Sequence, residues 1–505
     1  MTERSTPAAP RQPALPWPLA VAIVFASSAV VLVLETLAGR LLAPYVGVTL
    51  QTFTGIIGVV LAGIAVGTWQ GGRLADRFDA RALLPPTMVL GGGLSIASVP
   101  LIRMFGSADL GGGQAAIVFL AGVAFFLPSV VLSAISPMVV TLQLADIHHT
   151  GRVVGRLSAV STFGSLVGVF VTGFVLIAAF PTTPLVLSIG GALVAAGAGL
   201  WWYLGRPGGE QHVMGLVVFA LGAGAFAITA PQPCQVESAY FCVNVLHDTA
   251  RPSGRILLLD DLRHSYVDLD DPTYLGLSYA QTMSDVLATV APAGQSIVAV
   301  HIGGGGFTMP RYLEATRPGT SNTVLEVDPT LVDVAEDELG LVPDDSLDIV
   351  IGDARVHLRD VETASADLVI GDAFGGQAVP WHLTTKELIE DVQRVLRDSG
   401  VYTINLIDRP PLGFARAEVA TLRAVFAHVA VVAPPDRIAG IEGGNFVLVA
   451  SDSPIALDAI AERNRHRGDD DEVVGDRAGL DAFTGDADVL TDEHAPVDQL
   501  LTPEE

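Results

Sequence analysis

Long, uninterrupted apolar stretches dominate the first half of the chain. Seven of them approach the roughly 20 residues that a helix needs to cross the hydrocarbon core of a bilayer. They lie near residues 16–38, 52–72, 83–103, 114–143, 158–180, 183–204 and 212–231. No small-residue cleavage site follows the first stretch, so we interpret it as an anchor and not as a signal peptide. The pattern predicts a multi-pass α-helical membrane domain of seven spans over residues 1–232.

Three features inside these stretches carry further expectations. Pro128 and Pro137 remove helix hydrogen bonds in the fourth stretch, which should therefore kink or contain a re-entrant turn. Small residues recur over 58–67 and 164–173, a spacing that favours close helix packing in lipid more than a transport role. Glu35 and Arg40 near the end of the first stretch are either functional charges or an interfacial pair.

Arginines are concentrated after the even-numbered stretches, at Arg73, Arg77, Arg81, Arg152, Arg156 and Arg206. Cytoplasmic loops are enriched in positive charge, so this bias places the N-terminus inside. Seven spans then put the C-terminal part on the non-cytoplasmic side, and a span more or fewer would return it to the cytoplasm. Cys234 and Cys242, just past the last stretch, would suit a disulfide in an oxidising compartment, although two reduced cysteines would give the same pattern.

From residue 236 onwards, short apolar strands alternate with amphipathic helices. A small β-hairpin region is expected over 238–246 and 255–259, followed by a helix over 274–290. Further strands are expected at 296–302, 323–327, 347–351, 366–370, 401–406, 429–432 and 446–450. Regular alternation predicts an α/β Rossmann-like, doubly wound parallel sheet over 233–505.

Charge changes sharply at the same boundary. Residues 1–232 hold ten Arg, no Lys and seven acidic residues, whereas the remainder holds 18 basic and 47 acidic residues. The acidic half argues against nucleic-acid binding, which needs a basic surface. It would attract cations such as polyamines, or it reflects solvation in high salt.

The expected strands of the second half end in glycines or carboxylates. The first runs into Gly303, Gly304, Gly305 and Gly306, and the next three end near Glu326, Asp353 and Asp372. Ligands of such sheets bind beyond the carboxyl ends of the strands. Glycines allow close backbone approach, and an acid about 20 residues later suits a ribose diol. The pattern indicates an adenosine-containing cofactor, with helix capping as the alternative role of each acid.

Several motifs in the second half resemble the spermidine synthases, which transfer an aminopropyl group from decarboxylated S-adenosylmethionine to a diamine. They are ESAYFCVNV, RILLLDDLRHS, HIGGGG, LEVDP, IGDAR, DLVIGDAF and HLTTKEL, and the later VLTDEHAPVDQL is similar to the tail of membrane-fused members. The resemblance implies a class I methyltransferase-like fold, with decarboxylated S-adenosylmethionine or S-adenosylmethionine as donor and no metal. It also implies a polyamine-biosynthetic transferase.

The resemblance assigns roles position by position. Glu326 would bind the ribose hydroxyls, Asp353 and Ala354 the adenine, and Asp372 would be the catalytic acid-base residue. Gly303, Gly304 and Gly305 would adjoin the donor. His264 stands where the family usually has a Gln near the donor, and Tyr279 where a Tyr lines the acceptor site.

Departures from the family fall on the acceptor side. Gly306 and Gly375 replace family acids, and Ala280 replaces a His. A dicationic acceptor needs carboxylates to replace its hydration. Three hypotheses therefore remain: an aminopropyltransferase-like enzyme, an S-adenosylmethionine-dependent methyltransferase with another acceptor, and a catalytically silent nucleoside-binding module on a membrane or transport domain. Expected partners are the lipid bilayer and a small amine acceptor, with no nucleic acid and with a homodimer as an option.

Overall fold

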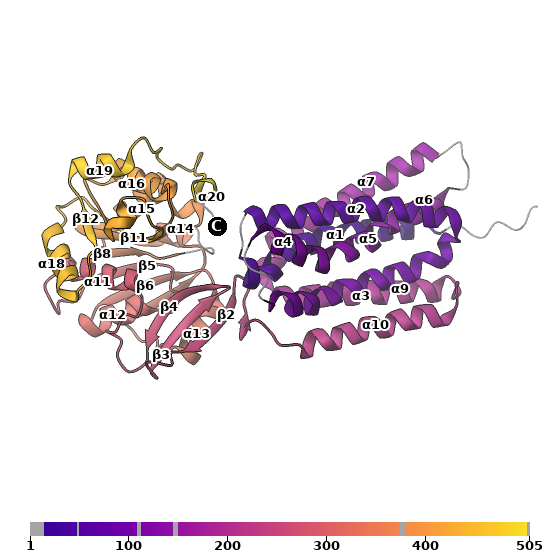
Figure 1. Ribbon diagram of the computed structural model, residues 1–505, viewed down its shortest axis with the longest axis horizontal. Coiled ribbons are helices and arrows are strands. Elements are labelled where there is room, and N and C mark those ends of the chain that lie inside the picture. The colour runs from indigo at the N-terminus through magenta and orange to yellow at the C-terminus, as the bar shows by residue number, and fades with distance from the viewer. Residues whose placement is uncertain (1–14, 48–49, 109–112, 145–149, 374–378, 502–505) are drawn as a thin grey trace, which may run out of the picture. The chain divides into compact units, whose positions relative to one another are not determined.

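A computed structural model describes the chain except residues 1–14, 48–49, 109–112, 145–149, 374–378 and 502–505. It divides into two compact units, Met1–Pro233 and Cys234–Glu505 (Figure 1). Helices make up the first unit, and helices and strands make up the second.

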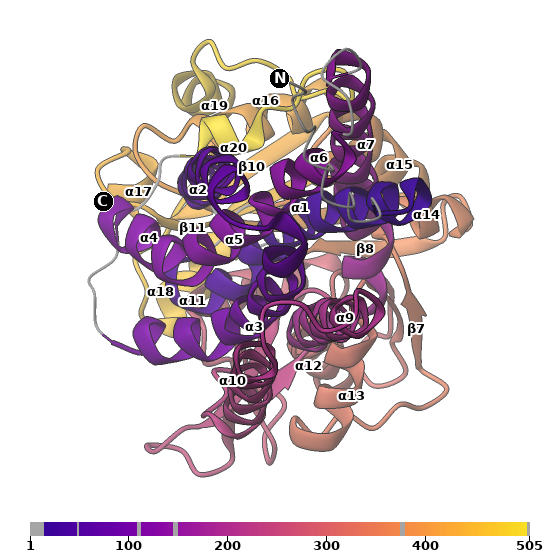
Figure 2. The same ribbon diagram turned by 90° about the vertical axis from the view of Figure 1, so that its right-hand side faces the viewer.

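The N-terminal unit is a bundle of long apolar helices. They are α1 (Trp17–Val46), α2 (Leu50–Arg77), α3 (Ala80–Gly106), α4 (Gln114–Ala121), η1 (Gly122–Phe126), α5 (Leu127–Ser133), α6 (Ile135–Gln143), α7 (Thr150–Val171), η3 (Thr172–Leu176), α8 (Ile177–Ala179), α9 (Thr182–Tyr203) and α10 (Glu210–Thr229). Within the described residues, seven helices are long and apolar enough to cross a membrane. Figure 2 shows α3, α9 and α10 side by side, as their contacts require.

The fourth apolar stretch bends without reversing direction. A π-helical segment, η1, precedes Pro128, and the helix is interrupted at Ala134 before Pro137. Each proline lacks the N–H that the regular helix would use, so the local register changes where one stands. The stretch still forms a single candidate span, Gln114–Gln143, which agrees with a kink and not with a re-entrant turn.

Glycines bring some of these helices into backbone contact. A Cβ added at Gly164 would lie 2.5 Å from the carbonyl oxygen of Phe25, and one at Gly67 would lie 2.1 Å from that of Val130. Gly58 and Gly173 have nothing within 4 Å. The expected close packing of small residues therefore occurs at Gly164 and Gly67. It does not occur at Gly58 and Gly173.

Glu35 and Arg40 lie near the end of helix α1. Arg40 Nη1 donates to the carbonyl of Ile177 at 3.4 Å. Glu35 Oε2 is buried and has no hydrogen-bond partner among the described residues.

The C-terminal unit begins with a small antiparallel sheet. Its strands, in order, are β1 (Val236–Glu237), β2 (Cys242–His247), β3 (Gly254–Leu259) and β4 (Leu262–Asp268). The sequence pattern predicted only a hairpin and missed β4. Cys234 and Cys242 form a disulfide at the start of this sheet.

A larger mixed sheet forms the centre of this unit. Its strands are β5 (Val298–Ile302), β6 (Ser321–Glu326), β7 (Leu347–Ile351), β8 (Ala366–Gly371), β9 (Leu396–Asp408), β10 (His428–Ala433), β11 (Gly444–Ser451) and β12 (Glu472–Val474). The order is β12-β10-β11-β9-β8-β5-β6-β7, and the five strands from β9 to β7 are parallel. This is a Rossmann-like arrangement, but the expectation of an all-parallel sheet was wrong: β11 is antiparallel to β9 and β10. Residues 434–443 between β10 and β11 are too few for a parallel crossover, which takes a dozen or more residues.

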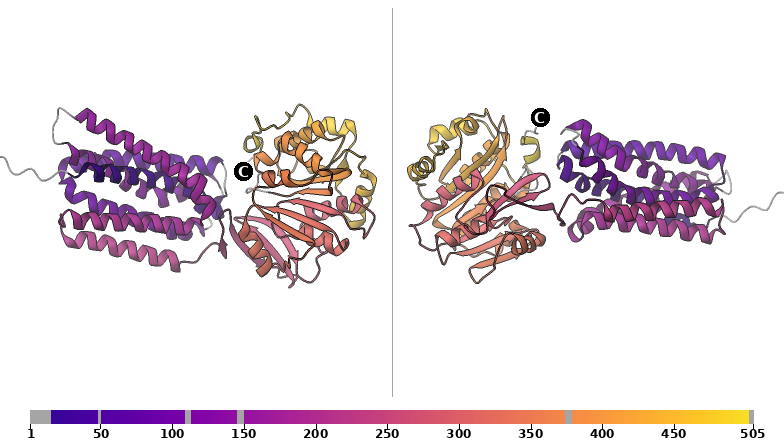
Figure 3. Two further views of the ribbon diagram at one scale, coloured as in Figure 1. Left: turned by 180° about the vertical axis from the view of Figure 1, so that it is seen from behind. Right: turned by 60° about the horizontal axis from the view of Figure 1, so that its bottom comes forward.

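Helices cover both faces of the large sheet, as the views in Figure 3 show. One face packs against α11 (Ser278–Val290), α12 (Thr308–Thr316) and α18 (Leu457–Arg467). The other packs against α14 (Ala354–His357), α15 (Lys386–Val395), α16 (Gly413–Val425) and α19 (Arg477–Thr484). Helix α13 (Pro329–Glu338) packs against β6 and the small sheet. Shorter helical segments are η4 (Leu358–Asp360), η5 (Trp381–Leu383), α17 (Pro435–Ile438) and α20 (Val497–Leu500).

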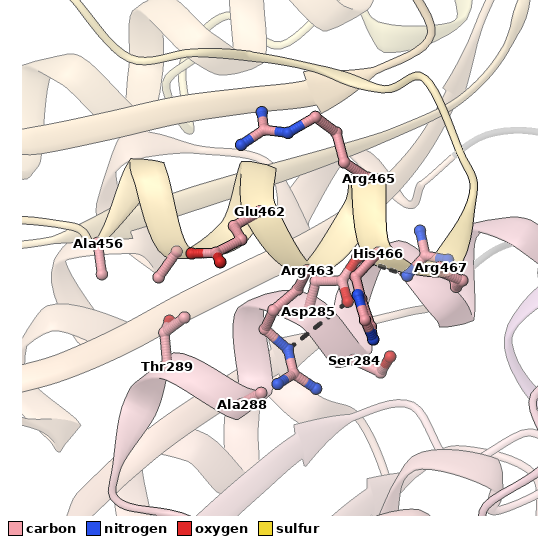
Figure 4. A pocket seen from close by; sticks show the side chains of 11 residues that line it. Ser284, Asp285, Ala288, Thr289, Ala456, Glu462, Arg463, Arg465, His466 and Arg467 are labelled. Atoms are coloured by element: carbon pink, nitrogen blue, oxygen red, sulfur yellow. Dashed lines mark hydrogen bonds and ion pairs between the residues drawn. The ribbon is translucent and has the colours of Figure 1, made fainter.

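A network of charges joins α11 to α18 beside a surface hollow (Figure 4). Asp285 on α11 is buried, and Arg467 Nη1 donates to its Oδ2 at 2.5 Å. Arg463 Nε lies 3.7 Å from the other oxygen. Asn464 and Thr282 both donate to Asp471, which follows α18. This network fixes α18 on the sheet face opposite α16.

Candidate active site

The glycine loop after β5 runs against the end of β8. Gly303 and Gly305 have φ angles of 95° and 50°, in the region that favours glycine. A Cβ on Gly303 would lie 2.5 Å from the carbonyl oxygen of Asp372. The loop can therefore approach the tip of β8 only because it lacks side chains.

Glu326 at the end of β6 is fixed beneath this loop. Its Oε2 accepts from the backbone N–H groups of Gly304 at 2.7 Å and Gly305 at 3.2 Å, and its Oε1 accepts from that of Asp328 at 2.9 Å. Burial raises the pKa of Glu326, and these hydrogen bonds oppose the rise. A carboxylate offers about four lone-pair sites. One site is left after these three bonds.

Asp353 caps helix α14. Its Oδ1 accepts from Arg355 N at 2.8 Å, and Oδ2 lies 3.2 Å from His382 Nε2. Ala354, the first residue of the helix, is buried. The helix cap uses one oxygen of Asp353. The predicted binding of adenine by Asp353 and Ala354 stays a prediction. His382 was not singled out from the sequence, although it opens the HLTTKEL motif.

Asp372 follows β8 and is held by two neutral side chains. The Tyr279 hydroxyl on α11 donates to Oδ2 at 3.1 Å, and Asn405 Nδ2 on β9 donates to Oδ1 at 2.9 Å. Asn445 Nδ2 on β11 in turn donates to Asn405 Oδ1 at 2.9 Å. Burial raises the pKa of Asp372 to about 6, against the effect of the Asn405 and Tyr279 hydrogen bonds. A carboxylate with this pKa is well placed to accept a proton near neutral pH.

Neither asparagine was predicted from the sequence. The available signal was a polar residue within the otherwise apolar run of β9, where Asn405 is buried. Its partner Asn445 lies 40 positions further along the chain. Only the pairing of β9 with β11 brings the two amides together.

Strand β4, which the sequence pattern missed, covers the glycine loop. Ser265 Oγ accepts from Gly306 N at 3.0 Å. A Cβ on Gly305 would lie 3.2 Å from His264 Nδ1, and burial lowers the pKa of His264 to about 4. The carbonyl of His264 lies 3.3 Å from the Tyr279 hydroxyl. The structure thus brings His264, Tyr279, Asp372, Glu326 and the glycines together.

Two of the three positions that depart from the resembled family, Gly306 and Ala280, are enclosed. A Cβ on Gly306 would lie 2.7 Å from Ser265 Cβ, so a side chain could enter there only if β4 moved. Ala280 is buried on α11. Gly375 lies outside the described residues. Within the described part of the chain, no group of three or more His, Cys, Asp or Glu side chains is placed to hold a metal ion.

Comparisons with known proteins find relatives for part of this chain. No family model matches the chain. Over 139 residues, 27% of this chain and 45% of the relative, it is 30% identical to a polyamine aminopropyltransferase of Vibrio vulnificus. Over 142 residues, 28% of this chain and 53% of the relative, it is 30% identical to that of Chromobacterium violaceum. The chain thus spans about half the length of the curated relatives it matches.

Two further similarities concern a methyltransferase and a solved structure. The chain is 25% identical over 164 residues to the eEF1A lysine and N-terminal methyltransferase of Xenopus laevis, covering 30% of this chain and 23% of that protein. A probable spermidine synthase from Corynebacterium glutamicum aligns with a TM-score of 0.48 and 26% identity, over 53% of this chain and 98% of that one. The curated relatives named here are transferases. Over the matched segment, this chain is similar to the polyamine aminopropyltransferases.

Proposed function

We propose that the C-terminal unit transfers an alkyl group from an S-adenosylmethionine-type donor to an amine, as an aminopropyltransferase-like enzyme. One observation carries this proposal. Asp372, with a pKa of about 6, lies beside the glycine loop that follows β5, and Glu326 at the end of β6 binds the backbone of the same loop. A base and a nucleoside subsite therefore share one edge of the sheet. The family of the matched segment supports the same reaction class.

The donor would lie along the glycine loop. Glu326 would accept hydrogen bonds from ribose hydroxyls, and Asp353 with Ala354 would border the adenine. His264, whose pKa is lowered to about 4, is neutral at pH 7 and adds no charge near the sulfonium. The acceptor would enter past Tyr279.

The transfer step is a displacement at carbon. The amine lone pair attacks the methylene carbon bonded to the sulfonium, a C–N bond forms, and the C–S bond breaks with its electron pair going to sulfur. Decarboxylated S-adenosylmethionine would thereby release methylthioadenosine. Asp372 would accept the proton that the amine loses and would orient the nucleophile, while proximity supplies much of the rate.

A methyltransferase is the second candidate, and one curated relative favours it directly. The same base and the same nucleoside subsite would serve S-adenosylmethionine, with S-adenosylhomocysteine as by-product. An alanine and two glycines at the family's acceptor-binding positions fit an acceptor other than a polyamine. The two candidates differ in the by-product that they release.

A by-product assay on the full chain in detergent tests the proposal. Methylthioadenosine and S-adenosylhomocysteine are measured with each donor and a panel of amines. Asp372→Asn should lower turnover by about 10²- to 10⁴-fold, the usual contribution of general-base catalysis, with little change in donor affinity. Asp398→Asn, which alters an exposed carboxylate of the same unit, is the matched control. By-product from neither donor would favour a silent nucleoside-binding module.

We further propose that the N-terminal unit holds the enzyme in the lipid bilayer. Seven helices of sufficient length and hydropathy support this placement. The arginine bias favours the non-cytoplasmic side for the C-terminal unit.

A further inference from the structure

Arginine side chains lie at the edge of the sheet that carries Asp372. Strands β8, β9 and β10 run in the same direction, so the segments that follow them reach the same edge. Asp372 follows β8, Arg409 follows β9, and Arg437 lies in α17 just after β10. This unit holds 47 acidic and 18 basic residues, so two arginines at the same edge as the base are notable.

Two adjacent glycines at the start of β11 make room for these arginines. A Cβ on Gly443 would lie 2.5 Å from Arg409 Cγ, and one on Gly444 would lie 2.7 Å from Arg437 Cζ and Nε. Gly444 also has a φ of 143°. The Arg437 guanidinium therefore lies directly against the β11 backbone, where no side chain could stand.

Arg437 still has an unused hydrogen-bond donor. Its Nη1 donates to the carbonyl of Asn445 at 3.2 Å, whereas its buried Nε has no acceptor among the described residues. In the same part of the chain no ion pair joins Arg437 to a carboxylate. The nearby Asp408 uses its oxygens on the backbone N–H groups of Arg409 and Ala415. A buried, unmet guanidinium donor is unfavourable and would be satisfied by an anion.

A continuous chain of hydrogen bonds joins this guanidinium to the base. Arg437 contacts the backbone of Asn445, whose amide contacts Asn405, whose amide contacts Asp372. All three links cross neighbouring strands or the segments beside them. Arg437 and Asp372 are therefore linked through Asn445 and Asn405, with the base at one end of this chain and a positive charge at the other.

We propose that the acceptor is an amine that also carries an anionic group, and that Arg437 binds this group. The inference rests on the proposed transferase function and names its acceptor class. A planar guanidinium binds carboxylate or phosphonate oxygens through two parallel N–H bonds. A diamine would place its second ammonium near Arg437, and like charges oppose that binding. The amine at the other end of the acceptor faces Asp372.

Calorimetry on the full chain in detergent, with methylthioadenosine bound, tests this directly. The probes are 4-aminobutanoate, 3-aminopropylphosphonate and 1,4-diaminobutane, which share an amine and differ in the other end. We expect at least one anionic probe to bind about tenfold or more tightly than the diamine, and the tighter of the two identifies the anion. Arg437→Gln should remove this preference, and Arg437→Lys should keep part of it.

Arg465→Gln is the matched control, because Arg465 is an exposed arginine on α18 that lines the hollow beside α11 and has no part in the chain of hydrogen bonds to Asp372. It should leave all three affinities unchanged. Unchanged methylthioadenosine affinity in Arg437→Gln would show that the variant is folded. Equal binding of the diamine and the anionic probes, binding of none of them, or no effect of Arg437→Gln would overturn the inference.

The by-product assay separates this inference from the proposed function. An Arg437-dependent preference for anionic probes without by-product from either donor would overturn the transferase and leave the anion site standing. By-product formed best with 1,4-diaminobutane would support the transferase and overturn the anionic acceptor.

Discussion

At the scale of single residues, the chemistry of the site depends on the raised pKa of the Asp372 carboxyl group. Burial raises its pKa to about 6 from an ordinary value of 3.8, while Tyr279 and Asn405 hold it down. A raised folded-state pKa means that the protonated form favours folding. This contribution is complete below about pH 4 and is lost as the pH rises through about 6. General-base catalysis needs the deprotonated carboxylate, so activity should increase as the pH rises through about 6.

The pH dependence of kcat/KM should therefore show an acid limb with a midpoint near 6. Tyr279→Phe removes one donor to the carboxylate, so the midpoint should move up by roughly one unit, since about 1.4 kcal/mol corresponds to one pKa unit. Steady-state rates of by-product release from pH 5 to 9 would measure it. A limb that stays in place in Tyr279→Phe would show that the titrating group is not Asp372.

Glu326→Gln should weaken nucleoside binding by about 1–3 kcal/mol, because hydrogen bonds to a charged acceptor contribute that much. The variant would also loosen the glycine loop, since two loop N–H groups donate to this carboxylate. Titration calorimetry with methylthioadenosine measures the change. Glu338→Gln, at an exposed acid on α13, should bind normally. Equal affinities for the two variants would reduce Glu326 to a structural support of the loop.

The sequence could place the acids at strand ends but not their partners. Glu326, Asp353 and Asp372 each follow an apolar run, and that local pattern is enough to find them. Tyr279 and Asp372 are 93 positions apart, and Ser265 and Gly306 are 41 apart. Such contacts arise from packing between distant segments, which no local pattern records.

At the scale of elements, the sequence pattern identified the strands made mostly of buried apolar residues and missed a strand rich in polar ones. Strands β5 and β8 are largely buried and consist mostly of apolar residues, so they were recognised. Strand β4 contains Arg263, His264 and Ser265, and these polar residues hid it. The direction of β11 depends on a short connection and not on its own residues. Periodicity identifies a strand but does not give its direction.

The contact between α11 and α18 is a testable element of the fold. Arg467→Ala would leave Asp285 buried with only Arg463 near it, which should destabilise the C-terminal unit. Arg467 is 22% exposed, so we expect about 2 kcal/mol, below the 3–5 kcal/mol of a fully buried pair. Differential scanning fluorimetry of the full chain should show a melting temperature lower by about 4–8 °C. Arg477→Ala breaks a pair whose arginine is 92% exposed and should have no measurable effect. Equal melting temperatures for both variants would contradict a stabilising role of the network.

At the scale of the whole molecule, the chain combines a nearly uncharged apolar unit with a strongly acidic one. The boundary was visible in the composition because apolar residues dominate one unit and acidic residues the other. The proposed side of the membrane depends on the number of spans and on a few arginines. It also matters for the chemistry, because the donor must be present where the site is.

Cysteine accessibility can decide the side, since the chain contains only Cys234 and Cys242 and they are joined in a disulfide. We expect an external C-terminal unit. In intact cells, a membrane-impermeant maleimide should then label the protein only after treatment with an impermeant phosphine reductant, because the disulfide blocks both thiols. A cysteine-free variant carrying Phe78→Cys, between the second and third spans, supplies the opposite marker and should be labelled only after lysis. Labelling of the native cysteines only after lysis would place the enzyme in the cytoplasm, on the same side as this marker. The span count or the arginine bias would then be wrong, while the chemistry proposed for Asp372 would be unaffected.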